Sequence, residues 1–181
     1  MKKPIGQGGR VSYHLATADD LPAIYGLIAD FGEKYAHAIE PVHPSVAEQL
    51  VAEQSVFSLT LDGYTVGALA FTDHYPNLHA EIHLLVRPWA MRDVLRSTAL
   101  VEIVTALFIS LKLVKLKGKC LAQQVGAKRL LKSYGFRNQG YLKGETIFQG
   151  KLADMELYEL TQQYWLDKWI PQHDVWQREK S

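Results

Sequence analysis

The chain has 181 residues, which is enough for one well-buried core and too few for two domains of ordinary size. Its 48% hydrophobic and 22% charged residues are typical of a globular protein and exclude a disordered chain. The net charge of +1 conceals an asymmetry, because residues 103–144 contain nine Lys or Arg and no Asp or Glu.

No segment is typical of a membrane span or a secretion signal. Charged side chains interrupt the most apolar stretch, residues 98–116, and the first nine residues lack an apolar centre. Cys120 is the single cysteine and has no partner for an internal disulfide, which fits a reducing compartment. We therefore expect a cytoplasmic protein that does not enter a membrane.

The predicted elements alternate between helices and strands along the chain. Thr17–Ala18–Asp19–Asp20 has the form of a capping box that opens a helix, and Asp62–Gly63 is a two-residue hairpin signal. Gly135 marks the end of a later helix. In chain order the sequence predicts a strand at 10–15, helices at 21–32 and 45–54, strands at 56–61, 64–72 and 78–86, a helix at 94–111, a strand at 113–116, a helix at 122–133, and strands at 136–149 and 152–160.

This order predicts an α+β fold. We expect a mixed, mostly antiparallel twisted sheet of six to seven strands with helices on both faces. The predicted domain covers residues 10–161, after a flexible N-terminus at 1–9. A Trp-rich helical extension follows at 162–181.

The order of elements resembles the GNAT superfamily of acetyltransferases, and four sequence patterns support the resemblance. Together they span residues 11–160, and they are most similar to members that acetylate ribosomal proteins. The patterns are the opening strand and helix entry at 13–21, an apolar helix-to-strand run at 107–116, Leu-Leu-Lys-Ser-Tyr-Gly-Phe at 130–136, and the final strand at 154–160.

The resemblance implies a site for acetyl-CoA where the sheet parts beside Val86. The backbone of Leu84, Leu85 and Val86 would pair with the pantetheine arm, and Gln124 would contact the same arm. The family's glycine-rich phosphate loop is replaced by Met-Arg-Asp-Val-Leu-Arg at 91–96. A different mode of phosphate binding is therefore expected, through the guanidinium groups of Arg92 and Arg96.

The strand at 78–86 has an alternating pattern that suits acid–base chemistry. Its apolar residues face one side, so Glu81 and His83 share the other. The resemblance makes Glu81 the general base that deprotonates an amine, and His83 has the chemistry for the same role near neutral pH. Many members place a Tyr proton donor where this chain has Leu131, so Tyr134, three residues on, is the candidate donor. The alternative interpretation is a polar strip on a half-exposed strand.

His79, Glu81 and His83 would also present two imidazoles to a metal ion. A further, distant ligand would be needed and no residue is marked as one, so no metal is predicted. Cys120 is expected to be inert packing. The basic stretch at 103–144 lacks interleaved aromatic residues for stacking on bases, so nucleic acid is not an expected partner. A solvated basic face is the alternative.

The extension contains three of the four tryptophans, Trp165, Trp169 and Trp176. They would either cover the sheet of their own domain or dock on a protein partner. Two functions follow from the sequence. One is an acetyl-CoA-dependent N-acetyltransferase of a primary amine, with weakened or lost activity. The other is an inactive GNAT-fold scaffold in macromolecular assembly, such as phage head or internal-virion assembly, which would be virion-associated.

Overall fold

One mixed sheet organises the protein. The computed structural model describes residues 6–8, 10–35 and 44–178, and its strands follow the order β1-β2-β3-β4-β5-β6-β8-β7. All neighbouring strands are antiparallel except β5 and β6, which are parallel. The predicted fold class is therefore confirmed. The strands are β1 (Gly6–Gly8), β2 (Val11–Leu15), β3 (Val56–Leu61), β4 (Tyr64–Tyr75), β5 (His79–Val86), β6 (Lys115–Leu121), β7 (Arg137–Phe148) and β8 (Lys151–Thr161).

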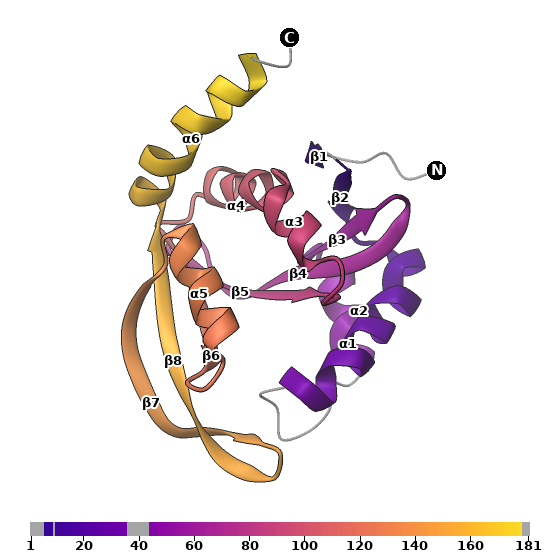
Figure 1. The fold of residues 1–181 in the computed structure, drawn as a ribbon, viewed down its shortest axis with the longest axis vertical. Helices are drawn as coiled ribbons and strands as arrows, with labels where there is room; N and C mark the ends of the chain where they lie inside the picture. The colour runs from indigo at the N-terminus through magenta and orange to yellow at the C-terminus, as the bar shows by residue number, and fades with distance from the viewer. Residues whose placement is uncertain (1–5, 9, 36–43, 179–181) are drawn as a thin grey trace.

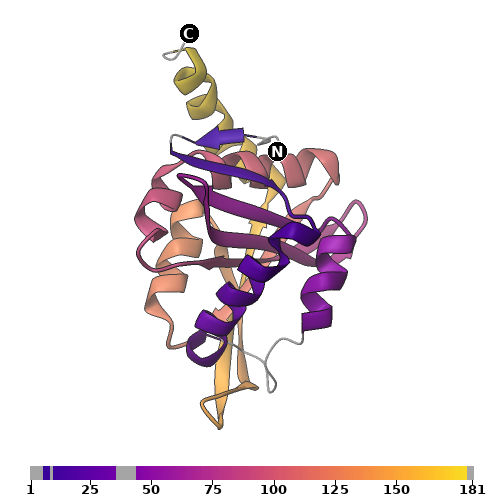
Figure 2. The same cartoon turned by 90° about the vertical axis from the view of Figure 1, so that its right-hand side faces the viewer.

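Helices cover both faces of this sheet (Figure 1 and Figure 2). Beneath α1 and α2 lies an apolar cluster that includes Leu27, Val51 and Ala68. A larger cluster on the other face includes Val86, Leu107 and Trp165. In the described part of the chain, none of the helices is long and apolar enough to cross a membrane. The helices are η1 (Ala18–Asp20), α1 (Leu21–Tyr35), α2 (Pro44–Ala52), α3 (Met91–Arg96), α4 (Ala99–Ser110), α5 (Val125–Tyr134) and α6 (Gln162–Arg178).

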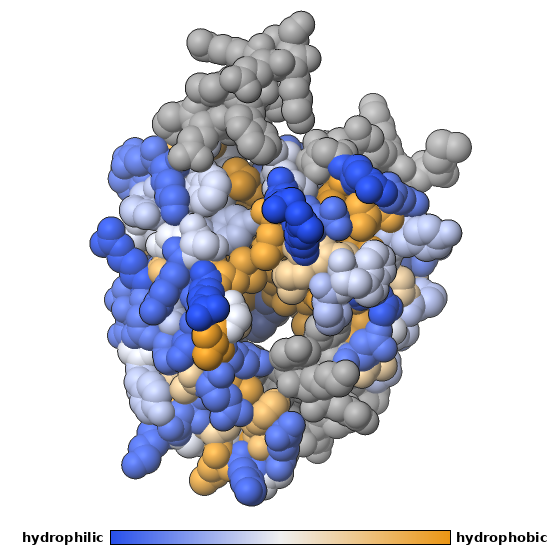
Figure 3. Space-filling view, in the orientation of Figure 1, coloured by the Kyte–Doolittle hydropathy of each residue, from blue (hydrophilic) through white to orange (hydrophobic). Residues whose placement is uncertain are grey.

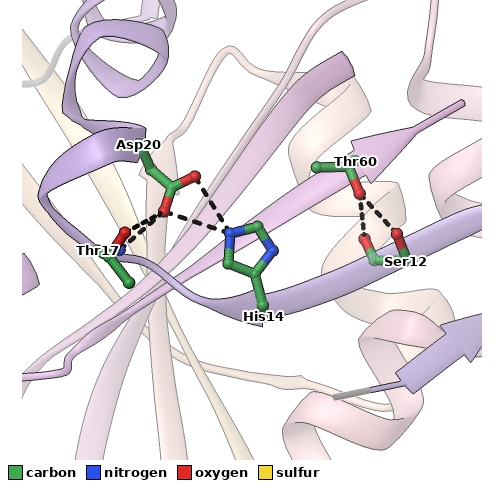
Figure 4. Close-up of polar contacts among 5 residues, drawn as sticks. All are labelled: Ser12, His14, Thr17, Asp20 and Thr60. Carbon is green, nitrogen blue, oxygen red and sulfur yellow. Dashed lines mark hydrogen bonds and ion pairs between the residues drawn. The ribbon is translucent and has the colours of Figure 1, made fainter. Parts of the chain in front are cut away.

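Local signals in the sequence form the expected structures. The Asp20 carboxylate accepts the Thr17 backbone N–H at 2.8 Å, and the His14 ring lies 3.1 Å from the same carboxylate (Figure 4). This arrangement opens the 3₁₀ turn η1, which leads directly into α1. Asp62 and Gly63 both have positive φ, at 51° and 86°, as a tight hairpin between β3 and β4 requires.

The prediction of a single helix at 94–111 is wrong, because the chain forms two helices, α3 and α4, with a break between them. Ser97 adopts an extended conformation, and its hydroxyl donates to the Val94 carbonyl at 2.7 Å. The same hydroxyl accepts the Ala99 N–H at 3.3 Å, so one side chain ends the first helix and begins the second.

Two strands also differ from expectation. The strand expected at 113–116 begins at Lys115 and runs on to Leu121, because Leu116, Gly118 and Cys120 alternate inward between lysines. At the opposite edge, β1 forms within the segment expected to be flexible and pairs with β2, with Gly6 opposite Tyr13.

Candidate active site

The sheet parts between β5 and β6, as the sequence predicted for the region beside Val86. In the described residues the two strands pair only at His79–Glu81, opposite Lys115–Lys117. Beyond that point β5 continues paired with β4 alone, while β6 continues paired with β8. In Figure 3 the surface has a recess on this face, which in Figure 1 falls below the end of β5, between α5 with β6 on one side and α1 on the other. One edge of β5 is therefore open for hydrogen bonding from residue 82 onward.

Glu81 lies at the last paired position before the strands part, and its side chain is only 8% exposed. Its Oε2 lies 2.8 Å from Nζ of Lys119 on β6. Its Oε1 lies 3.7 Å from Nε2 of His83, and the same nitrogen hydrogen-bonds to the Thr72 hydroxyl at 2.8 Å. The structure thus brings the two predicted bases together and adds two residues, Lys119 and Thr72, that the sequence did not identify.

The electrostatics of this cluster favour a neutral imidazole beside an ammonium. Partial desolvation of the ring lowers the pKa of His83, although 48% of its side chain is exposed; the Glu81 carboxylate opposes this change and Lys119 adds to it. The hydrogen bond to Glu81 raises the pKa of Lys119. At neutral pH Lys119 is therefore charged, and His83 is able to accept a proton.

A metal ion does not suit this cluster. His79 shares the face of Glu81 and His83, but its Nε2 lies 3.2 Å from Nζ of Lys117. With a second ammonium, that of Lys119, bonded to Glu81, cations already occupy the positions beside two of the three ligands considered from the sequence. In the part of the chain that is described, no group of three His, Cys, Asp or Glu side chains has the geometry of a metal site.

The short helix α3 is formed by residues 91–96, the stretch predicted from the sequence to lie at the position of the phosphate loop. Its Val94 is fully buried, whereas Arg92 and Arg96 are exposed and fall on one side of the helix. No glycine is present from residue 68 to 117, so this segment contains no glycine-rich loop. The open strand edge offers unpaired backbone groups, and the charged groups that α3 offers are the exposed side chains of Arg92 and Arg96.

Gln124 lies at the N-terminus of α5 and is partly exposed. Its side-chain oxygen accepts the Leu121 N–H at 3.4 Å, which closes the turn between β6 and α5. Leu84 and Leu85 are partly buried and Val86 is buried. Leu84 and Val86 pack in the larger core cluster, so the group that they can offer to a cofactor is the backbone.

Tyr134 lies in an aromatic stack formed with α6. Its ring is 6.2 Å from that of Trp165 and 5.5 Å from that of Trp169, in both cases nearly parallel. Burial raises the pKa of Tyr134 to about 12, which makes it a weaker acid than an ordinary tyrosine. This placement favours packing over proton donation.

Trp165 does not serve as an exposed anchor for a partner, because it is fully buried and its Nε1 donates to the Thr105 hydroxyl at 2.9 Å. Trp169 is partly buried and donates to the Tyr134 carbonyl at 3.4 Å. The first half of α6 therefore covers its own domain, the alternative considered from the sequence. The Trp176 side chain lies outside the described side chains.

Cys120 is buried on β6, and burial raises its pKa to about 11. A thiol in this state is a poor nucleophile at neutral pH, in agreement with the expected packing role.

Comparison with known proteins identifies the fold. No family model and no curated protein matches the chain. Among solved structures, RimL, a ribosomal alpha-N-protein acetyltransferase in complex with coenzyme A, matches with a TM-score of 0.75 and 14% identity over 90% of this chain and 99% of that one. Spermidine N-acetyltransferase from Vibrio cholerae, in complex with CoA and spermine, matches at 0.73 and 17% over 87% and 98%. Ribosomal-protein-alanine N-acetyltransferase from Brucella melitensis matches at 0.72 and 20% over 82% and 98%.

These similarities cover nearly the full length of each neighbour. The chain therefore has the fold of the GNAT acetyltransferases, which the sequence patterns resembled.

Proposed function

We propose that this protein is an acetyl-CoA-dependent N-acetyltransferase acting on a primary amine. The observation that supports the proposal most is the parting of β5 and β6 directly after Glu81. It leaves an open strand edge next to a buried carboxylate, so a thioester and a proton acceptor have places side by side. The solved neighbours described as complexes with CoA share this fold.

The residues that would hold acetyl-CoA lie on both sides of the recess. The open backbone edge of Leu84, Leu85 and Val86 offers hydrogen bonds to the amides of the pantetheine arm. Gln124 presents a side-chain amide from the α5 side. Arg92 and Arg96 are the cations that α3 offers to the phosphates, as bidentate donors.

The reaction needs a base because an amine is protonated at neutral pH. A Glu81 or His83 side chain takes one proton from the ammonium, and the freed nitrogen lone pair attacks the thioester carbonyl carbon. The new C–N bond forms and the C–S bond breaks. The nitrogen then releases its second proton to solvent, and the departing thiolate takes a proton from solvent. Acetyl-CoA supplies the activated acetyl group. The buried position of Glu81 excludes water from one side of the base.

Binding of acetyl-CoA is the first test. With ligand at about 100 times its dissociation constant, a single site stabilises the fold by about 2.7 kcal/mol, which a thermal shift measures readily. Acetate at the same concentration is the matched control, because it lacks the nucleotide and the pantetheine arm. Absence of both a thermal shift and a calorimetric signal at millimolar acetyl-CoA contradicts the proposal.

Turnover is the second test. Release of free thiol from acetyl-CoA should depend on an added primary amine, and a tertiary amine should not replace it. Binding of acetyl-CoA without turnover of any primary amine would favour the inactive scaffold considered from the sequence, with the site kept for ligand binding alone.

A further inference from the structure

Lys119 makes a contact that the proposed reaction has not yet used. It lies on β6 two residues beyond the last residue paired with β5, where the strands have already parted. From there its side chain reaches back to Glu81 and closes an ion pair at 2.8 Å. The Lys119 side chain is 33% exposed and Glu81 only 8%, so the lysine remains in contact with water while the carboxylate does not.

The two oxygens of the Glu81 carboxylate have different neighbours. Oε2 faces the Lys119 ammonium, and Oε1 faces Nε2 of His83. A buried carboxylate is costly to keep ionised without a cation or donor, and the nearest cation is that of Lys119. The Glu81 side chain is only 8% exposed, whereas the His83 side chain is 48% exposed. Of the two candidate bases, His83 is the one that an incoming amine can reach from water.

We propose that Lys119 is a positioning residue, which holds one oxygen of Glu81 so that the other faces His83 and His83 receives the proton of the acceptor amine. This inference rests on the proposed transferase function and divides the roles within its site. The N–H bond of the ammonium breaks, the proton forms an N–H bond on the imidazole, and the electron pair stays on the amine nitrogen. The imidazolium is stabilised by Glu81 and later returns the proton to solvent.

Other charged groups face the cluster from neighbouring strands. Asp73 on β4 acts on both His83 and Lys119, in each case raising the pKa, and Glu145 on β7 acts on Lys119 in the same direction. His79 on β5 and Lys117 on β6 lie beside the cluster and contact each other. Among these groups Lys119 is the cation that lowers the pKa of His83, so removing Lys119 should raise that pKa.

The test compares three variants. Lys119→Met removes the ammonium, Lys119→Arg keeps a cation at the position, and Lys117→Met is the matched control on the same strand face. The pH dependence of kcat/KM is measured for each with acetyl-CoA and a primary amine. Histidine ring titrations are followed in parallel by NMR, with His83→Gln used to assign the His83 signal. Thermal unfolding verifies that each variant is folded.

In Lys119→Met we expect the acidic limb of the kcat/KM pH profile to move to higher pH, because His83 then remains protonated to higher pH. The NMR midpoint of His83 should move in the same direction. Lys119→Arg should restore the original limb and Lys117→Met should keep it. An unmoved limb and midpoint in Lys119→Met, or equal losses in Lys119→Arg, overturn the proposal.

The two proposals fail in different ways. If the unaltered protein neither binds acetyl-CoA nor turns over an amine, the transferase function fails, and the NMR midpoint still reports whether Lys119 acts on His83. If turnover is present and Glu81→Gln displaces the limb to lower pH, the carboxylate acts through His83, as proposed. If turnover in His83→Gln keeps the wild-type limb, His83 is not the base.

Discussion

The two ends of β5 differ in how they are held. At His79–Glu81 the strand is paired on both sides, to β4 and to β6, and Glu81 is buried with a lysine bonded to it. At residues 82–86 the strand is paired with β4 alone, and the following helix presents Arg92 and Arg96 to solvent. The Glu81 carboxylate that faces His83 is thus fixed by the sheet, whereas the candidate phosphate contacts depend on exposed side chains.

This difference separates the two parts of the proposed reaction. Groups held by a paired sheet lose little conformational entropy when a ligand arrives, whereas each exposed arginine must be ordered at the moment of binding. We therefore expect substitution of Glu81 to affect turnover more than cofactor binding, and substitution of Arg92 and Arg96 to affect cofactor binding more than turnover.

The largest expected effect is on turnover, at the paired end. Glu81→Gln removes the charge that faces His83 and Lys119 while keeping the shape of the side chain. Acid–base groups typically contribute about 100-fold or more to the rate, so kcat should fall by about 100-fold. The affinity for acetyl-CoA, measured by calorimetry, should stay within about twofold, because Glu81 is not among the residues proposed to hold the cofactor. A twofold change corresponds to roughly 0.4 kcal/mol of binding free energy. An unchanged kcat would remove Glu81 from the mechanism.

The next effect is on the pairing that holds the open end. A Cβ on Gly67 would lie 2.7 Å from the Leu85 carbonyl oxygen and 3.0 Å from a Val86 methyl group. Gly67→Ala must therefore displace β5 from β4 and should cost about 1–3 kcal/mol of unfolding free energy.

Gly126 provides the matched control for this substitution. A Cβ there meets no atom within 4 Å, and the residue lies in α5. Gly126→Ala should stabilise the protein by up to about 1 kcal/mol through helix propensity. Urea unfolding measures the change in unfolding free energy for both variants. If Gly67→Ala also stabilised the protein, the close contact at Gly67 would not be important for packing.

A smaller effect is expected from the exposed arginines. Replacing Arg92 and Arg96 together by Ala should weaken acetyl-CoA binding about tenfold, since a hydrogen bond to a charged group contributes roughly 1.5 kcal/mol. The loss should shrink at high salt, because exposed charges are screened. The double variant Lys143→Ala, Lys151→Ala on the β7–β8 hairpin removes the same charge elsewhere and is the control. Equal weakening in both would indicate long-range charge instead of contact.

Much of the fold follows from short-range signals in the sequence. The Asp62–Gly63 hairpin and the Thr17 capping box need only their own neighbours, and both formed as expected. The period of two along β5 placed Glu81 and His83 on one face, because strand geometry alone fixes that pattern.

The site as a whole could not be predicted in the same way. Lys119 meets Glu81 across 38 residues, and only the parallel register of β5 and β6 brings the two together. One lysine in a basic stretch has no local feature that marks it. The break between α3 and α4 also depends on the Ser97 hydroxyl, which bonds to the backbone of Val94 and of Ala99. The apolar periodicity of the sequence runs through this position and does not predict the break.

The smallest expected effect concerns a second carboxylate with a lysine, on the β6 side of the recess. Glu156 on β8 accepts hydrogen bonds from the Tyr158 hydroxyl at 2.6 Å, the Asn138 amide at 2.9 Å and the Lys128 ammonium at 3.1 Å. The Tyr158 hydrogen bond is the main cause that holds the pKa of Glu156 below its ordinary value of 4.5, and Lys128 and Asn138 add to it. Since Lys128 belongs to α5, this carboxylate joins the helix to the sheet.

The sign of the pH dependence follows from that lowered pKa. A carboxylate with a lowered folded pKa stabilises the protein above its ordinary pKa, and the stabilisation is lost as the pH falls through the folded value. Glu156→Gln should therefore be less stable than the unaltered protein at pH 7, and the gap should narrow as the pH falls below about 4.5. Urea unfolding at several pH values measures the gap, with Glu53→Gln, an exposed carboxylate, as control. A gap that is the same at all pH values would mean that the ionisation of Glu156 does not cause it, and that charge pairing with Lys128 does not hold α5 against the sheet.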